Sequence, residues 1–70
     1  MVYQHHRNGL CYEIVDRNGF DATLDREVVV YRPLYPSKYR SFTRTPEDFF
    51  GEVSPGVPRF AEVPRFGEVP

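Results

Sequence analysis

The chain has 70 residues, which leaves room for one small domain and excludes a multidomain enzyme. Hydrophobic residues make up 40% of it and aromatic residues 16%, so we expect the chain to fold rather than to stay disordered. Nine basic and ten acidic residues give a formal net charge of −1, which excludes a chain-wide basic field for nucleic acid or anionic lipid.

The first predicted element is a β-hairpin with strands at residues 2–6 and 10–16. The pair Asn8-Gly9 between them is typical of a two-residue type I′ turn, which pairs Arg7 with Leu10. A bulge at the glycine would shift this register by one residue, but the two-residue turn buries more apolar surface and is preferred. It places one set of side chains on a common face, which we expect to be the core face: Tyr3, His5, Leu10, Tyr12 and Ile14.

The next predicted elements are an exposed connection and two further strands. Residues 17–26 are polar and contain a second Asn-Gly pair, Asn18-Gly19, so we expect a connection there. Glu27–Tyr35 contains four successive apolar residues, as in a central strand that is buried on both faces. Pro33 is expected to limit its pairing on one edge. Tyr39–Arg44 is predicted to be a fourth strand because apolar and polar residues alternate along it.

One compact helical turn is predicted at Thr45–Gly51. Thr45 suits the N-cap, Pro46 suits the first helical position, and the two acids that follow lie at the positive end of the helix dipole. Gly51 suits the C′ position, where a helix ends.

Two segments after this turn, Glu52–Ser54 and Val57–Phe60, are expected to supply one or two last short strands. The predicted fold is therefore mainly β. It is a small, SH3-like, partly open barrel of four to five short antiparallel strands, with one helical turn before the last strand. We place this single small β-barrel domain at residues 1–60.

The end of the chain carries a repeat. Val57–Glu62 reads Val-Pro-Arg-Phe-Ala-Glu, and Val63–Glu68 reads Val-Pro-Arg-Phe-Gly-Glu. A proline at every sixth position favours an extended, weakly paired chain, so residues 61–70 are expected to form a loose tail. The second copy is also a candidate for strand addition to the open edge of another molecule, so the alternatives are a monomer and a weak oligomer through this tail.

Residues suited to catalysis or metal binding are few. His5, His6 and Cys11 are the only imidazole and thiol groups, and adjacent strand residues point to opposite faces, so only one histidine can join the cysteine. Two such ligands do not make a structural zinc site, and a Cys–His nucleophile pair here lacks an orienting third group. No P-loop, dinucleotide fingerprint or hydrolase elbow is present. We expect no enzyme activity, no catalytic or metal-binding residue and no cofactor.

One segment departs from the average composition, because no acid lies between Glu27 and Glu47. Guanidinium groups and aromatic rings together can stack bases and hold phosphates, as in single-strand-binding barrels. The alternative is that the rings are core and that the arginine stems cover apolar edges; a chain this short favours it, because it must bury most of its aromatic side chains. The candidate binding surface comprises Arg32, Tyr35, Lys38, Tyr39, Arg40, Phe42 and Arg44.

Several segments of residues 2–60 resemble one known family. They are Tyr3 and His5, Glu27–Tyr35 with its Val-Val-Tyr-Arg-x-Leu-Tyr core, Phe42–Phe49 and Pro58–Phe60. Together they are similar to the short bacterial proteins grouped as domain of unknown function 1653. The chain departs from that pattern in a first hairpin that is one residue longer and in Thr45-Pro46, where Arg-Pro is expected. The resemblance implies a compact bacterial cytoplasmic β module, and it implies no activity and no site residue.

The expected function is that of a non-enzymatic binding or adaptor module. The favoured partner is a protein or peptide, met at a sheet edge or at an aromatic patch around Tyr35, Tyr39 and Phe42. The alternative is nucleic-acid binding through residues 31–44. A single cysteine excludes an internal disulfide, and neither a signal peptide nor a membrane-spanning run is visible, so we expect a cytoplasmic protein without membrane contact.

Overall fold

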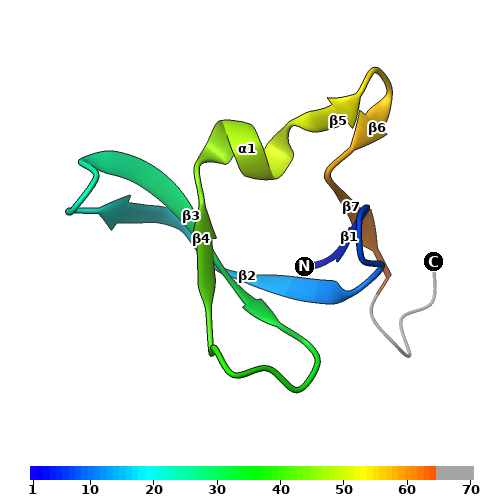
Figure 1. Cartoon of the computed structure of the whole chain (residues 1–70), viewed down its shortest axis with the longest axis horizontal. Helices are drawn as coiled ribbons and strands as arrows, with labels where there is room; N and C mark the ends of the chain where they lie inside the picture. Colours follow the sequence, from blue (N-terminus) through cyan, green and yellow to red (C-terminus); the bar gives the residue numbers. More distant parts are fainter. Residues whose placement is uncertain (65–70) are drawn as a thin grey trace.

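Figure 1 shows a computed structural model of the protein, in which residues 1–64 are described. These residues form strands joined by turns and loops, with one helix between the fourth and fifth strands. The elements in chain order are β1 (Val2–His5), β2 (Cys11–Asp21), β3 (Arg26–Pro33), β4 (Phe42–Arg44), α1 (Pro46–Phe50), β5 (Glu52–Ser54), β6 (Val57–Pro58) and β7 (Phe60–Val63).

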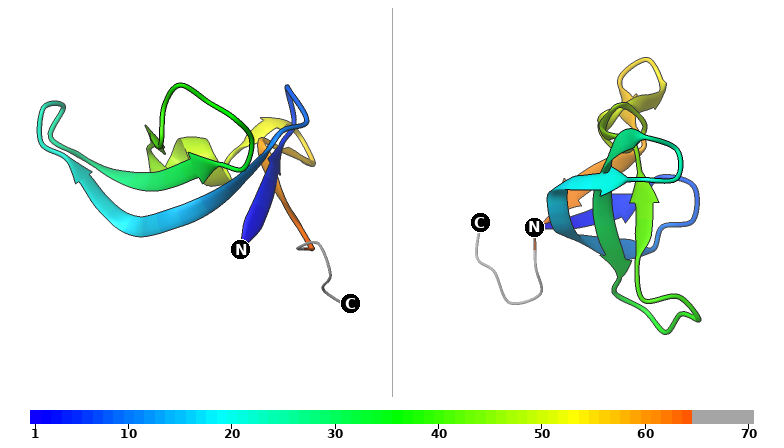
Figure 2. Two further views of the ribbon diagram at one scale, coloured as in Figure 1. Left: turned by 90° about the horizontal axis from the view of Figure 1, so that it is seen from below. Right: turned by 90° about the vertical axis from the view of Figure 1, so that its left-hand side faces the viewer.

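Five strands form one antiparallel sheet in the order β4-β3-β2-β1-β7, and β5 pairs with β6 in a separate hairpin. β2 and β3 curve together, and α1 lies on the concave side of the sheet (Figure 2). The predicted mainly β fold, with its short antiparallel strands and single helical turn, is confirmed. Over residues 1–64 the sheet ends at β4 and β7 and does not close into a barrel. An SH3-like identity stays a prediction.

The last strand of the sheet, β7, begins at residue 60, where the predicted domain ends. β7 continues to Val63, which pairs with Val2, so the sheet extends three residues beyond residue 60. Within residues 1–64, three strands follow the helix instead of one or two, because β5 and β6 form their own hairpin before the chain reaches β1. Residues 65–70, the rest of the expected tail, lie outside the described residues.

The core consists mainly of aromatic rings that meet edge to face. The ring of Phe49, which is fully buried, also stacks face to face on the ring of Phe60, with 4.2 Å between the centroids. Aromatic pairs contribute about 0.5–1.5 kcal/mol each beyond the area that they bury. This ring therefore fixes α1 to the sheet. The buried core cluster comprises Tyr3, Tyr12, Val29, Tyr31, Phe49 and Phe60, with Ile14, Tyr35 and Phe42 partly buried against it.

The predicted register of the first hairpin is wrong by two residues. The His5 backbone N–H donates to the Leu10 carbonyl (2.9 Å), so the turn has four residues and Arg7 does not pair with Leu10. Of the described residues in this turn, only Gly9 has a positive φ (70°), whereas a type I′ turn needs two. The Asn8 side chain instead accepts a hydrogen bond from the Leu10 backbone N–H (2.8 Å), which favours the longer turn.

The core face of this hairpin is nevertheless as predicted, because a shift by an even number of residues keeps every side chain on its face. Tyr3 now pairs with Tyr12, and both are buried together with His5. Leu10 is the exception: it lies beside the turn and is 39% exposed.

The connection predicted at residues 17–26 is also corrected. β2 continues to Asp21 and pairs with the start of β3, and the turn occupies residues 22–25, where Asp25 has a φ of 53°. Asn18-Gly19 therefore lies within a strand, at an irregularity in the register between Asp16 and Gly19. A Cβ on Gly19 would lie 2.8 Å from a methyl group of Val30, so the glycine permits the close approach of the two strands.

The later elements follow the prediction more closely. β3 is a central strand with Val28 and Val29 both buried, as predicted, but it ends at Pro33, two residues before the predicted end at Tyr35. β4 is shorter than predicted, because residues 39–41 belong to the loop before it. Thr45 caps α1 by accepting a hydrogen bond from the Asp48 backbone N–H (3.2 Å).

Gly51 ends the helix as predicted but has an extended backbone with a φ of −79°. The glycine is needed there because a Cβ would collide with the Glu47 carbonyl group.

Candidate functional site

The structure places the seven predicted surface residues in three different environments. Arg32 alternates with the buried Tyr31 along β3, so it points to the opposite face, where it is paired with Glu13 (2.5 Å). Tyr35 and Phe42 are partly buried against the core. Lys38, Tyr39 and Arg40 lie on the exposed loop before β4, and Arg44 lies at the end of β4 beside α1.

The aromatic side chains of this segment are mostly core residues. Tyr31 is only 5% exposed, and burial raises the pKa of its hydroxyl, although a hydrogen bond from Arg44 opposes this effect. A hydrogen bond between the hydroxyls of Tyr12 and Tyr35 (2.8 Å), together with burial, raises the pKa of Tyr35 to about 12. Tyr31 and Tyr35 therefore remain protonated near neutral pH, and their hydroxyls act as hydrogen-bonding groups at the core.

Tyr39 is the aromatic residue of this segment that is exposed. Tyr39 is 58% exposed, and its ring centroid lies 6.1 Å from that of Phe42. The Lys38 ammonium group lies 5.6 Å from the centroid of the Tyr39 ring. We refer to Lys38, Tyr39 and Phe42 as the Tyr39 surface. Lys38 and Tyr39 lie in the loop before β4, and Phe42 is the first residue of β4, which is an edge strand of the sheet.

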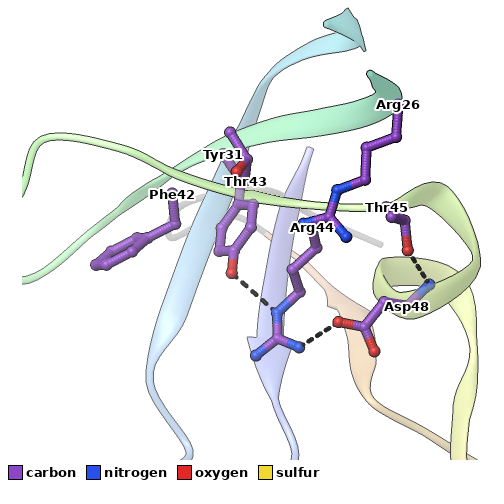
Figure 3. A pocket seen from close by; sticks show the side chains of 7 residues that line it. All are labelled: Arg26, Tyr31, Phe42, Thr43, Arg44, Thr45 and Asp48. Atoms are coloured by element: carbon purple, nitrogen blue, oxygen red, sulfur yellow. Dashed lines mark hydrogen bonds and ion pairs between the residues drawn. The ribbon is translucent and has the colours of Figure 1, made fainter. Parts of the chain in front are cut away.

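Arg44 forms the centre of a polar cluster at the other end of β4. Its Nε donates to the Tyr31 hydroxyl (3.0 Å), and its Nη1 donates to Asp48 Oδ2 (2.7 Å), as Figure 3 shows. Burial alone would lower the pKa of Arg44, but the hydrogen bonds with Asp48 and Tyr31 outweigh it and raise that pKa. The guanidinium group is therefore charged and held in one orientation.

Arg59 joins the same cluster from the segment between β6 and β7. Its Nε donates to the Asp48 carbonyl oxygen (3.0 Å) and lies 3.4 Å from Asp48 Oδ1. Its own backbone is fixed, because its N–H donates to the Gly51 carbonyl (3.0 Å) and its carbonyl accepts from the His6 N–H (2.8 Å). We call Tyr31, Arg44, Asp48 and Arg59 the Arg44 cluster.

Two hollows meet at Arg44. The first, the edge hollow, measures about 500 Å³, lies beside β4 and appears in Figure 3. The second, the basic hollow, measures about 550 Å³. Arg26, Tyr31, Phe42, Thr43, Arg44, Thr45 and Asp48 line the edge hollow, and His5, His6, Arg7, Arg44, Val53 and Arg59 line the basic hollow.

His5 forms part of the wall of the basic hollow and is 7% exposed. Its Nδ1 accepts a hydrogen bond from the Arg7 backbone N–H (3.0 Å), so the neutral ring carries its proton on Nε2. Burial lowers the pKa of His5, and the charges of Arg44, Arg59 and Arg7 lower it further. All three guanidinium groups therefore lie close enough to act on one imidazole.

Sequence reasoning identified Arg44 but missed His5, Asp48 and Arg59 as its neighbours. These residues come from β1, α1 and the segment before β7, and the order of strands in the sheet brings them together. The tail repeat and the family resemblance both included Arg59, but neither placed it beside Arg44.

The described part of the chain contains neither a cluster of metal ligands nor a membrane-spanning helix. Within residues 1–64, no group of three or more His, Cys, Asp or Glu side chains is placed to hold a metal ion. The helix in this part is five residues long, and no helix there is long and apolar enough to cross a membrane.

Comparison with known proteins identifies the family. Residues 1–67 match the family described as a protein of unknown function (DUF1653), and the chain belongs to this family. The match confirms the resemblance of residues 2–60 and includes every residue of the Arg44 cluster. No curated protein and no solved structure matches the chain.

Proposed function

We propose that the protein is a non-enzymatic binding module that takes up an extended segment of a protein partner at the free edge of β4. One observation carries this proposal. β4 is the last strand on its side of the sheet and, within residues 1–64, pairs only with β3. An edge strand presents unpaired backbone groups, and extended peptides bind by adding a strand to such an edge.

Side chains on both ends of β4 support this proposal. The Tyr39 surface lies at the start of the strand, and the edge hollow lies along it and at its end. An exposed aromatic ring is a common anchor in protein interfaces. The hollow offers Thr43, Thr45 and Arg26 as polar partners for one side chain of the added strand. Backbone pairing would supply affinity, and these two sites would supply specificity.

The state of the polar groups supports binding rather than catalysis. Tyr31, Arg44 and Asp48 are hydrogen-bonded to each other, and burial keeps the Tyr31 hydroxyl protonated. A general acid or base needs a pKa near the working pH, and a nucleophile needs an adjacent base. Tyr31 and Arg44, whose pKa values are both raised, do not suit the role of a general acid or base.

Nucleic-acid binding through residues 31–44 is the second candidate. The exposed Tyr39 ring with Lys38 and Arg40 favours it, because bases stack on aromatic rings beside cations. Arg32 speaks against it, because it lies on the opposite face from Tyr31 and is paired with Glu13. We also propose that the protein is bacterial, on the basis of the family resemblance, and that it is cytoplasmic, on the basis of its single cysteine.

Selection of a random peptide library on the immobilised chain tests the proposal. We expect enriched peptides that raise the hydrogen-exchange protection of the β4 backbone amides on binding. Tyr39→Ser should weaken their affinity about tenfold or more, as loss of an aromatic anchor does. Phe20→Ser is the matched control, because Phe20 is 59% exposed against 58% for Tyr39 and lies at the far end of β2.

A selection without a common motif, or equal losses in both variants, would reject the peptide-binding proposal. A labelled single-stranded oligonucleotide separates the second candidate. Salt-sensitive binding that Tyr39→Ser abolishes would favour nucleic acid, and no binding even at low salt would exclude it.

A further inference from the structure

The basic hollow brings three arginines together from three distant segments. Arg7 comes from the turn between β1 and β2, Arg44 from the end of β4, and Arg59 from the segment before β7. The hollow of about 550 Å³ that they line also contains His5, His6 and Val53, and no acidic side chain of the described residues lines it. Cationic groups around a concave site concentrate anions there.

The charges in and around this hollow do not cancel. Among the described residues, Arg44 and Arg59 share the single carboxylate of Asp48, and Arg7 adds a third positive charge. His5 adds none at neutral pH, because its pKa is lowered by burial and by these arginines. The balance is two positive charges, which matches a ligand with two negative charges.

Arg44 and Arg59 also keep hydrogen-bond donors for a ligand. The bonds of Arg44 to Tyr31 and Asp48 use Nε and Nη1, and in Figure 3 its other terminal nitrogen points away from Asp48. Arg59 uses Nε for its contacts with Asp48. Within residues 1–64, the Nη2 group of Arg44 and both Nη groups of Arg59 make no hydrogen bond. Each guanidinium group is thus anchored on one side and has donors left on another.

These two arginines are held in place before any ligand binds. Arg44 is fixed by Tyr31 and Asp48 and lies over the Phe60 ring, with 5.5 Å from its Cζ to the ring centroid. Asp48 is fixed in turn by its helix, which Thr45 caps. Arginines that are already ordered lose less conformational entropy on binding than free side chains do.

The number of guanidinium groups distinguishes between two classes of anion. A carboxylate has two oxygens, and one guanidinium group can satisfy both in a bidentate pair. A phosphate monoester has three terminal oxygens and carries close to two negative charges at neutral pH. Three cationic groups that approach from three segments therefore suit the phosphate better than the carboxylate.

We propose that the basic hollow is a binding site for a phosphate monoester dianion, held by Arg44 and Arg59 with Arg7 as the third cation. The site does not depend on peptide binding at β4, because Arg7, Arg59 and His5 take no part in that surface. A phosphorylated side chain and a mononucleotide both carry this group. A phosphodiester, as in a nucleic-acid backbone, carries one negative charge and is the poorer ligand.

The test is a titration of the chain with inorganic phosphate at constant ionic strength and slightly alkaline pH, followed by nuclear magnetic resonance. We expect saturable shifts of the Arg44 and Arg59 side-chain signals, because these guanidinium groups contact the bound anion. Arg7→Gln should weaken binding about fivefold, as loss of an exposed ion pair does. Arg40→Gln is the matched control, because it removes the same charge from another exposed loop and should leave the affinity unchanged.

Arg7→Gln tests the site without endangering the fold, because Arg7 is exposed and contributes its backbone N–H, not its side chain, to the bond with His5. Unsaturable shifts, or equal losses in Arg7→Gln and Arg40→Gln, would overturn the proposal. Acetate that binds as tightly as phosphate would overturn the assignment to a dianion. Three further ligands distinguish the possible sources of the phosphate group: a phosphoserine peptide, adenosine monophosphate and a dinucleotide. Tighter binding of the dinucleotide than of both monoesters would also contradict the proposal.

Discussion

The basic hollow and the Tyr39 surface contain the same kinds of side chain, cationic and aromatic, and they differ in how these side chains are held. In the basic hollow, Arg44 and Arg59 are bonded to Asp48, which is fixed by a capped helix. On the Tyr39 surface, the Lys38 ammonium lies over the neighbouring Tyr39 ring, and that ring is 58% exposed. The arginines of the hollow are thus ordered by contacts across the fold, whereas the Lys38 and Tyr39 side chains contact residues within three positions in the chain.

This difference separates two kinds of recognition. A site built from distant segments has fixed geometry and suits a small ligand of defined shape and charge, because little entropy is lost when the ligand binds. An exposed ring on a loop can adjust its position and suits a partner that supplies its own order, such as a strand added to an edge. The edge hollow and the basic hollow meet at Arg44, but the basic hollow and the Tyr39 surface depend on different parts of the structure.

The largest expected effect is on the stability of the fold around the hollow. Phe49→Ala should lower the free energy of unfolding by about 3–5 kcal/mol, because Phe49 is fully buried and stacks on Phe60. Tyr39→Ala should change it by less than about 0.5 kcal/mol, as is usual for an exposed residue. Urea unfolding of the two variants measures both values. Similar losses would show that the loop is as tightly coupled to the core as α1 is.

A smaller effect is expected on the pH dependence of the free energy of unfolding, because burial and the arginines of the hollow lower the pKa of His5. Its pKa in the folded chain lies below the ordinary value of 6.5, mainly through burial and further through Arg44, Arg59 and Arg7. As the pH falls through about 6.5, the unfolded chain takes up a proton at His5 and the folded chain does not. The unfolded state then binds more protons, so the free energy of unfolding decreases until the pH passes the lower, folded pKa.

Urea unfolding across this pH range, above the titration of the carboxylates, checks the prediction. The neighbouring histidine provides the control, because His6 is exposed. His6→Gln should retain the decrease below pH 6.5, and His5→Gln should remove it. Stability that is independent of pH in the unmodified chain would show that the arginines and burial do not act on His5 as described.

The sequence predicted local features well and the candidate site poorly, for a physical reason. The cap at Thr45, the end of α1 at Gly51 and the buried face of Tyr3 and Tyr12 depend on neighbours in the chain or on strand alternation. The first turn was mispredicted because Asn8 bonds to the Leu10 N–H and stabilises four residues instead of two. The Arg44 cluster could not be predicted, since it depends on which strands are adjacent in the sheet.

The last prediction is that removal of the second copy of the tail repeat has no measurable effect. In the first copy, Phe60 fills the core and Arg59 contacts Asp48, so the corresponding positions in this molecule are occupied. The period of six is even, so the second copy could replace the first in β7 with every side chain on its original face, but only by displacing it or by pairing with another molecule.

Deleting residues 65–70 should therefore leave the stability, the affinity for phosphate and the mass in solution unchanged. Urea unfolding and light scattering at two protein concentrations measure this. A change from dimer to monomer on deletion would instead show that the second copy adds a strand to a neighbouring molecule, and it would make the edge of the sheet, not the hollow, the site at which two chains meet.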